Sequence, residues 1–292
     1  MILHPTRSAL YMPGSNARAL EKAKTLGADA VILDLEDAVA PEQKAMARAQ
    51  VTAAVAAGGF GHRQVIIRIN ALDTPWGVED LAATAAAGPD AVLLPKPNRG
   101  ADIERATDGL RRAGAAEKTR LWAMVETPLA ILNIGELAGA ARHAGARLSC
   151  LVLGTNDLVK ETRAEMDAER TAALFWLSAA VTAARAHGLT VLDGVYNNFK
   201  DLTGLDHECA QGRRLGFDGK TLIHPDQVAT ANRVFAPGAD EVLWSRKIIA
   251  AFGLPENRGK GVITLEGRMV ELLHAETARR TVAIADAISK RG

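Results

Sequence analysis

The sequence has little cysteine and no excess of charge of either sign. Cys150 and Cys209 are its only cysteines, which excludes a disulfide framework and leaves no thiol set for a structural zinc site. Lysine and arginine together number 35 against 34 aspartates and glutamates, a formal net charge of +1. Surfaces that bind nucleic acid or anionic membranes usually show a basic excess or patch. We therefore expect neither nucleic acid nor a membrane as a partner.

The sequence also has no long apolar run. No stretch approaches the roughly 20 residues that a helix needs to cross a bilayer. The first residues, "MILHPTRSALYMPG", lack the charged-then-apolar order of a secretory signal peptide. With 292 residues, of which 48% are hydrophobic, the chain can bury one large core. We expect a globular protein of the cytoplasm.

Short apolar segments recur along the chain and alternate with alanine-rich segments of helical spacing. Near-continuous apolar strands separated by helices indicate parallel strands that are covered on both faces. Eight such units at this length predict an α/β fold, a (β/α)8 TIM barrel, with an open doubly wound sheet as the alternative. The expected strands are residues 8–12, 30–35, 65–69, 91–95, 121–125, 150–154, 190–194 and 220–224.

The chain continues beyond what eight units need. The segments "EVLWSRKIIAAFG" (241–253) and "GRMVELLHAETARRTVAIADAIS" (267–289) carry helical spacing and predict two further helices. No glycine-rich linker divides the chain. We expect a catalytic barrel over residues 1–228 and, over residues 229–292, a C-terminal helical extension of the same domain that caps the barrel or reaches a neighbouring subunit.

Polar residues follow each of the eight expected strands. Active sites of such barrels lie at the carboxyl ends of the strands, so these side chains should converge on one mouth. A single charged residue after a strand is usually only solvated loop, but eight in register predict an active site. In chain order they are Ser15 and Asn16, Glu36 and Asp37, Arg68 and Asn70, Lys96, Glu126 and Thr127, Asn156 and Asp157, Asp193 and Asn197, and His224.

Two of these carboxylates favour a metal site. Glu126 closes the fifth strand and Asp157 follows the sixth, and neighbouring parallel strands lie about 4.8 Å apart. No histidine or cysteine accompanies them at ligand spacing, which favours Mg²⁺, an ion that commonly takes one or two protein carboxylates. The alternative is a role at helix starts, with Thr127 as N-cap before Pro128, and Asp157 capping the next helix.

A cation and further acids belong to the same mouth. Arg68 lies in "VIIRIN", where a strand-end guanidinium is costly to bury unless it binds a carboxylate or an oxyanion. Glu36 and Asp37 are expected to hold metal-bound waters or to orient a cationic side chain. His224 in "LIHPDQ" is either an acid/base group or, as is more common, a hydrogen-bonding wall residue.

The segment "PGSNARALEK" runs from the first strand directly into a helix. The free N–H groups at a helix start suit phosphate. Arg18 and Lys22 are four residues apart and share a helix face, so they either contact such an anion or form a solvated surface beside Glu21.

A set of motifs together resembles the citrate lyase β-subunit-like branch of the HpcH/HpaI aldolase and citrate lyase superfamily. The likeness extends from about residue 7 to residue 275. It implies a Mg²⁺-dependent (β/α)8 barrel, often a homotrimer, that cleaves or forms C–C bonds in 3-hydroxyacyl thioesters. The motifs are "RSALYMPGSNARALEKA", "AVILDLEDAVAPEQKAMAR", "IIRIN", "LLPKP", "VETPLAILNIGELA", "LVLGTNDLVKE" and "GFDGKTLIHPDQV".

The resemblance also implies roles for individual residues. Glu126 of "ETPL" and Asp157 of "GTNDL" correspond to metal ligands, and Arg68 of "RIN" corresponds to the group at the thioester oxygen. The positions that contact a CoA or acyl-carrier thioester correspond to Tyr11, Arg18, Lys22, Ile223 and His224.

Glu271 is a departure from the pattern of these relatives. CoA lyases carry "MVD" on a late helix, and its aspartate acts as the acid/base, sometimes in a neighbouring subunit's site. This chain reads "GRMVELL", with Glu271 at that position. The longer side chain displaces the carboxylate by more than about an ångström, and mispositioning on that scale can cost roughly a hundredfold in rate. Malyl-CoA-type chemistry is therefore left open, and the substrate with it.

The sequence predicts a Mg²⁺-dependent carbon–carbon lyase that reversibly cleaves a thioester such as citryl-, citramalyl- or malyl-CoA. A base, either Glu271 or a water held by Glu36 and Asp37, would take the hydroxyl proton, and Arg68 would hold the departing enolate. An acyl-CoA thioesterase and a CoA-independent aldolase are the enzymatic alternatives, and a non-catalytic thioester-binding protein is a third. The expected partners are an acyl-CoA or acyl-carrier thioester and further copies of the chain, in a trimer.

Overall fold

The computed structural model of the chain describes residues 4–291. These residues form two compact units, one of residues 6–235 and the other of residues 236–291 with residues 4 and 5. Each unit has a hydrophobic core of its own. Among the described residues, none of the helices has the length and apolar character that a membrane crossing requires.

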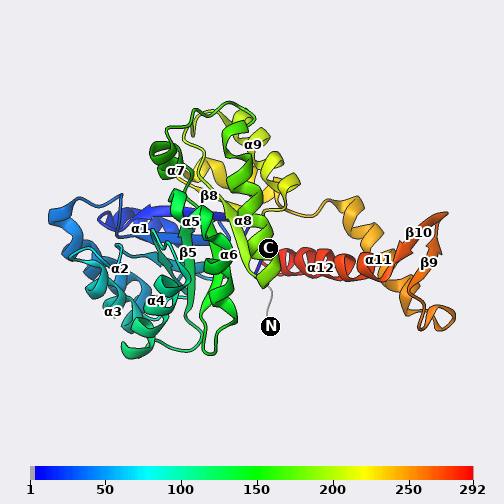
Figure 1. The fold of residues 1–292 in the computed structure, drawn as a ribbon, viewed down its shortest axis with the longest axis horizontal. Helices are drawn as coiled ribbons and strands as arrows, with labels where there is room; N and C mark the ends of the chain where they lie inside the picture. The colour runs from blue at the N-terminus through cyan, green and yellow to red at the C-terminus, as the bar shows by residue number, and fades with distance from the viewer. Residues whose placement is uncertain (1–3, 292) are drawn as a thin grey trace. The chain divides into compact units, whose positions relative to one another are not determined.

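The larger unit is a closed barrel of eight parallel strands in which each strand pairs with the next and β8 pairs with β1 (Figure 1). The predicted barrel is confirmed, and the open sheet is excluded. Every observed strand end lies within 2 residues of its expected position. The strands are β1 (Ser8–Pro13), β2 (Ala30–Asp34), β3 (Gln64–Arg68), β4 (Ala91–Leu94), β5 (Arg120–Val125), β6 (Leu148–Leu153), β7 (Thr190–Asp193) and β8 (Gly219–Leu222).

The strands are apolar on both faces because each face meets a different core. In β2, Ile32 points into the barrel and belongs to the inner cluster. Its neighbours Val31 and Leu33 point outward into a larger cluster shared with the helices. Successive side chains of a strand alternate between faces, so a buried parallel strand shows no polar alternation. This explains the unbroken apolar runs in the sequence.

Helices connect the strands and cover the outside of the barrel (Figure 1). Several begin at side chains that accept backbone N–H groups: Asn16 caps α1, Thr127 caps α5 before Pro128, and Asp201 caps α9. The α-helices are α1 (Ala17–Ala23), α2 (Lys44–Ala57), α3 (Gly77–Ala87), α4 (Gly100–Arg112), α5 (Pro128–Leu132), α6 (Ile134–Gly139), α7 (Thr155–Thr162), α8 (Leu174–His187), α9 (Leu202–Leu215) and α10 (Val228–Val234). Short 3-10 helices are η1 (Pro41–Gln43), η2 (Ala140–Arg142), η3 (Thr171–Ala173) and η4 (Pro225–Gln227).

The smaller unit contains two long helices, as predicted, and also a β-hairpin that was not expected. It consists of α11 (Ala239–Gly253), η5 (Pro255–Asn257), β9 (Val262–Leu265), β10 (Arg268–Glu271) and α12 (Leu272–Ser289). Glu266 and Gly267 both have positive φ, +49° and +77°, which is the backbone conformation of a two-residue hairpin turn. The hairpin buries Ile263 and Val270 against the two helices.

The hairpin corrects the expected position of Glu271. The segment 267–289 was predicted to be one helix, but its first residues form β10, and the helix begins only at Leu272. Glu271 therefore ends a strand and is the N-cap of α12, where its backbone N–H donates to Nδ1 of His274 at 2.9 Å. The turn at 266–267 decides this, because it pairs the residues after it with β9 instead of continuing a helix.

Candidate active site

Arg68 binds the acidic residues that follow β2. The register of β2 and β3 places it opposite Asp34, and its Nε and Nη2 donate to the two carboxylate oxygens of Asp34 at 2.7 and 2.6 Å. Its Nη1 lies 2.8 Å from Oε2 of Glu36 and 3.1 Å from Oδ2 of Asp37. The Glu36 contact is an ion pair without hydrogen-bond alignment. Each guanidinium nitrogen thus faces a carboxylate.

The ring of Tyr11 completes the surroundings of Arg68. The guanidinium carbon lies 4.9 Å from the centre of the ring, within the range of a cation–π contact. Burial alone would lower the pKa of Arg68, but Asp34 and Glu36 raise it well above its ordinary value. Burial also raises the pKa of Tyr11, so its hydroxyl stays protonated. Arg68 is therefore a permanent cation in a buried acidic cluster.

Two buried side chains bind the main chain of the loop that carries Glu36 and Asp37. Lys44 of α2 donates from Nζ to the carbonyl oxygens of Leu35 at 2.8 Å and Glu36 at 2.7 Å. The amide of Asn70 donates to the same Leu35 carbonyl at 2.9 Å. Because these donors are buried, the loop has little freedom to tilt, and the direction of the Glu36 side chain is set.

Glu126 follows β5 and is completely buried. Its Oε1 accepts the backbone N–H of Lys96 at 2.9 Å, while its Oε2 has no hydrogen-bond partner among residues 4–291. Burial, helped by the neighbouring carboxylates of Glu36 and Asp157, raises the pKa of Glu126 to about 8. An ionised Glu126 therefore needs a cation that its hydrogen bonds do not supply.

Gly154, which follows β6, allows this buried carboxylate to fit. A Cβ at this position would lie 2.4 Å from Cβ of Glu126 and 2.8 Å from its Oε2. Any larger residue would collide with the side chain at its root, so only glycine permits the close approach of the chain to Glu126. Asp157 lies in the first turn of α7, three residues further on.

The ammonium group of Lys96 lies near two carboxylates of the site, those of Glu36 and Asp157. Its Nζ lies 3.6 Å from Oδ1 of Asp157 and 3.9 Å from Oε1 of Glu36. The pKa of Glu36 is raised to about 7, because burial, together with the nearby acids, outweighs the opposing effect of Arg68. Glu36, Glu126 and Asp157 thus share one neighbourhood, as the strand-end argument predicted.

A cavity of 320 Å³ opens at this mouth. Gly154 and Asn156 form part of its wall. The predicted site residues that line it are Tyr11, Asp37, Arg68, Asp157 and Ile223.

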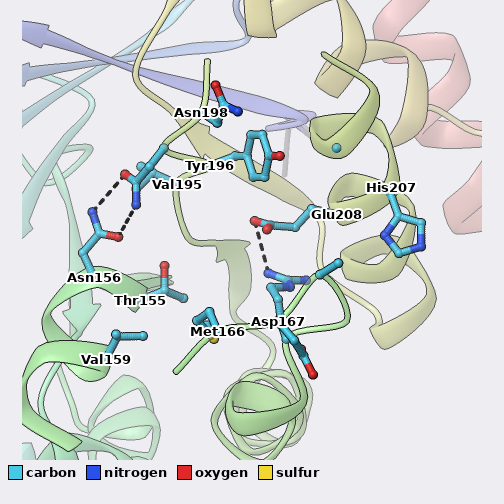
Figure 2. A pocket seen from close by; sticks show the side chains of 14 residues that line it. Thr155, Asn156, Val159, Met166, Asp167, Val195, Tyr196, Asn198, His207 and Glu208 are labelled. Carbon is cyan, nitrogen blue, oxygen red and sulfur yellow. Dashed lines mark hydrogen bonds and ion pairs between the residues drawn. The ribbon is translucent and has the colours of Figure 1, made fainter. Parts of the chain in front are cut away.

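A second cavity, of 360 Å³, adjoins the first and shares Thr155, Asn156 and Val195 with it. Figure 2 shows Asn156 at its edge, joined by two dashed lines to the β7–α9 loop. These are the hydrogen bonds that the amides of Asn156 and Asn197 exchange, at 2.8 and 3.2 Å. A ligand longer than the first cavity can therefore extend along α7 into the second.

Other predicted residues lie elsewhere. Arg18 and Lys22 are exposed on α1 and do not line the cavity. His224 is the N-cap of η4, accepts the N–H of Asp226 at 3.3 Å and stacks on Phe199, in agreement with the role of a wall residue. Glu271 belongs to the smaller unit.

Sequence reasoning missed two residues of this site, Asp34 and Lys44, and did not predict the contacts of a third, Lys96. Asp34 was not singled out, although its place at the end of β2, opposite the end of β3, is the signal that pairs it with Arg68. Lys44 gave no signal, because its partners are main-chain carbonyls. Lys96 was noted as a strand-end residue, but its contacts depend on a positive φ of 53°.

The donor set fits a magnesium ion with few protein ligands. Among residues 4–291, no group of three or more histidine, cysteine, aspartate or glutamate side chains is arranged to hold a metal. Glu126 and Asp157 supply two carboxylates, and Mg²⁺ commonly uses one or two while keeping water and substrate as its other ligands. The unpartnered Oε2 of Glu126 is the observation that favours such an ion.

Comparison with known proteins gives matches over nearly the whole chain. The family model described as HpcH/HpaI aldolase/citrate lyase matches residues 7–225. A (3S)-malyl-CoA thioesterase of Cereibacter sphaeroides is 49% identical over 98% of this chain and 96% of its own length. The citrate lyase subunit beta of Escherichia coli K12 is 36% identical over 96% of this chain and 93% of its own.

Solved structures agree with these matches. CitE from Mycobacterium tuberculosis, in complex with magnesium, acetoacetate and coenzyme A, superposes with a TM-score of 0.73. It is 28% identical, and the match covers 94% of this chain and 97% of that one. A citrate lyase beta subunit from M. tuberculosis, complexed with oxaloacetate and magnesium, is 28% identical and has a TM-score of 0.66 over 80% of this chain and 98% of that one.

Proposed function

Because the chain belongs to the HpcH/HpaI aldolase/citrate lyase family, we propose that it is a Mg²⁺-dependent enzyme that hydrolyses the CoA thioester of a malyl-type 3-hydroxy acid. The observation that carries the metal site is the buried, unpartnered Oε2 of Glu126 beside Asp157. The choice of thioester follows the Cereibacter relatives, and the choice of hydrolysis is also favoured by Glu271, which replaces the aspartate of the lyase motif.

Glu126 and Asp157 would hold the ion at the mouth of the barrel. When bound, Mg²⁺ supplies Lewis-acid polarisation of the substrate oxygens it contacts. Glu126 is fixed in place by the Lys96 N–H and by the close approach of Gly154, so the site would be preorganised for the ion.

Arg68 would stabilise negative charge on the thioester oxygen. Its Nη1 contacts Asp37, whose side chain is 63% exposed and can give way to a substrate oxygen. The other two nitrogens stay bound to Asp34, so the guanidinium keeps its orientation. A fixed donor aimed at developing charge is the usual source of electrostatic catalysis in acyl transfer.

Glu36 would act as the base. It would accept a proton from a water as the water oxygen bonds to the thioester carbonyl carbon. The carbon–sulfur bond then breaks, and the proton passes to the departing CoA thiolate, which leaves as a thiol. The main-chain anchors from Lys44 hold the Glu36 loop throughout.

Carbon–carbon lysis is the second candidate, favoured by the match to the citrate lyase subunit beta of Escherichia coli. In that reaction the base takes the proton of the substrate hydroxyl. The bond that breaks joins the carbon that bears this hydroxyl to the carbon next to the thioester carbonyl. The products are a keto or aldehyde acid and an acetyl thioester enolate, which Arg68 would hold until it is protonated.

One experiment separates the candidates. Malyl-CoA is incubated with the enzyme with and without Mg²⁺, and free thiol, glyoxylate and acetyl-CoA are each measured. Hydrolysis yields malate and free thiol without glyoxylate, whereas lysis yields glyoxylate and acetyl-CoA without thiol. Turnover that is unchanged by chelation of the metal would contradict the proposed site, and binding without any turnover would support the non-catalytic alternative.

A further inference from the structure

Lys96 contributes to the acidic site in two separate ways. Its backbone N–H donates to Oε1 of Glu126 at 2.9 Å, and this requires a left-handed conformation, φ 53°, that non-glycine residues rarely adopt. Its ammonium group points among the carboxylates of the same site, 3.6 Å from Asp157 and 3.9 Å from Glu36. Strained backbone conformations of this kind persist where the surrounding structure imposes them, often at functional sites.

The contacts of the ammonium group are loose. Charge-assisted hydrogen bonds between nitrogen and a carboxylate oxygen are about 2.7–2.9 Å long. Both Lys96 distances are longer, so the ammonium is held by the summed charge of its neighbours and not by directed bonds. Its side chain is 39% exposed, in contrast to the buried Arg68 next to it. Lys96 can therefore leave this position without breaking a strong hydrogen bond.

There is room for the side chain to move. Lys96 lines a cavity of 240 Å³ on the β3–α3 and β4–α4 side of the mouth, separate from the cavity that Arg68 and Asp157 line. Asp73, whose side chain is exposed, lines that cavity too and offers a second carboxylate. The lysine thus lies between the carboxylates of Glu36 and Asp157 on one side and this neighbouring cavity on the other.

We propose that the Lys96 ammonium is the resident counter-cation of the acidic site and that a divalent ion binding at Glu126 and Asp157 displaces it into the neighbouring cavity. This inference rests on the metal site of the proposed function. Without an ion, the lysine balances part of the charge of the acids around it. With a doubly charged ion in place, the two cations repel each other at close range, so ion and ammonium exclude one another.

A consequence is that Lys96 weakens metal binding. The ion must compete with a positive charge that is already present and is tethered to the site. Removing that charge while keeping the volume of the side chain should tighten the binding of Mg²⁺. A residue that merely supported the site would have the opposite effect, since its loss would loosen the ligands.

Isothermal titration of the intact protein with MgCl₂ tests this. Lys96→Met should bind Mg²⁺ roughly tenfold more tightly than wild type, a modest part of the repulsion between such charges at contact distance. Lys96→Arg keeps the charge and should stay near wild type. Lys118→Met, in the exposed loop before β5, is the matched control and should have no effect. Equal or weaker binding by Lys96→Met overturns the inference.

A second measurement uses wild-type protein alone. An amine-acylating reagent is applied with and without Mg²⁺, and modification of Lys96 is followed by peptide mass spectrometry. Displacement predicts faster acylation of Lys96 with the ion, while Lys118 stays unchanged. An unchanged or slower rate overturns the inference. If wild type binds no Mg²⁺, or Glu126→Gln binds it equally well, the metal site itself is wrong; if only the Lys96 effects are missing, the metal site stands.

Discussion

Replacing Glu126 by glutamine should stabilise the metal-free protein at high pH. The pKa of Glu126 is raised from 4.5 to about 8 in the folded protein, with burial as the largest cause. A carboxyl group with a raised pKa contributes stability that is fully present below its unfolded pKa and is lost as the pH rises through the folded one. Glutamine has the same shape and never ionises, so it avoids this loss.

The size of the effect follows from the two pKa values. The difference corresponds to at most about 5 kcal/mol, at about 1.4 kcal/mol for each pH unit. Linkage places about 3 kcal/mol of it between about pH 5.5 and about pH 9. Because about 1 kcal/mol shifts the melting temperature of a large domain by roughly 2–4 °C, Glu126→Gln should gain about 6–12 °C on wild type over that range.

The assay is thermal unfolding in EDTA at several pH values, followed by the same series in MgCl₂. A ligand that binds only the folded state raises its stability. Wild type should therefore recover stability in Mg²⁺ at high pH, and Glu126→Gln should not respond. A pH-independent difference between the two proteins, or an equal response of both to Mg²⁺, would refute the reasoning.

Three further substitutions test other parts of the site. Arg68→Ala should lower kcat far more than it raises KM, because Arg68 is assigned to charge that develops during the reaction; steady-state kinetics showing a change in KM alone would remove that role. Gly154→Ala places a Cβ 2.4 Å from that of Glu126 and should abolish the Mg²⁺-induced rise in melting temperature, while Gly135→Ala, with open space around it, should keep that rise. Lys44→Met removes the charged donor from the buried carbonyls of Leu35 and Glu36, which keep only the Asn70 amide and the Val39 N–H, and it should cost about 1–3 kcal/mol in urea unfolding, so an unchanged midpoint would contradict the anchoring role.

The sequence was sufficient for the barrel because its signal is repeated. Each strand is an apolar run followed by a polar group, and eight repeats compensate for uncertainty in any single one. The same logic brought Glu126, Asp157 and Arg68 to one end of the barrel, since parallel strands place all their carboxyl ends together. These features depend on strand order and direction alone.

The remaining features depend on register or on a single backbone angle. Asp34 pairs with Arg68 because the register of β2 and β3 places the two residues opposite each other. The sequence of either strand alone does not determine this register. Lys96 contacts Glu126 from a backbone conformation with positive φ, which a lysine in the sequence does not predict. The hairpin before α12 begins at one turn, and the apolar spacing after it is compatible with a helix, which is why Glu271 was misplaced.

Lys44 and Asn70 hold the loop that carries Glu36 and Asp37 in a way that leaves its side chains free to change during evolution. Both grip carbonyl oxygens, which every amino acid possesses, so the path of the loop does not depend on which side chains stand at positions 36 and 37. Substitutions at positions 36 and 37 can therefore change the charge at the mouth of the barrel without changing the backbone conformation of the loop. A laboratory library randomised at these two positions should yield mostly folded variants with altered ligand preference.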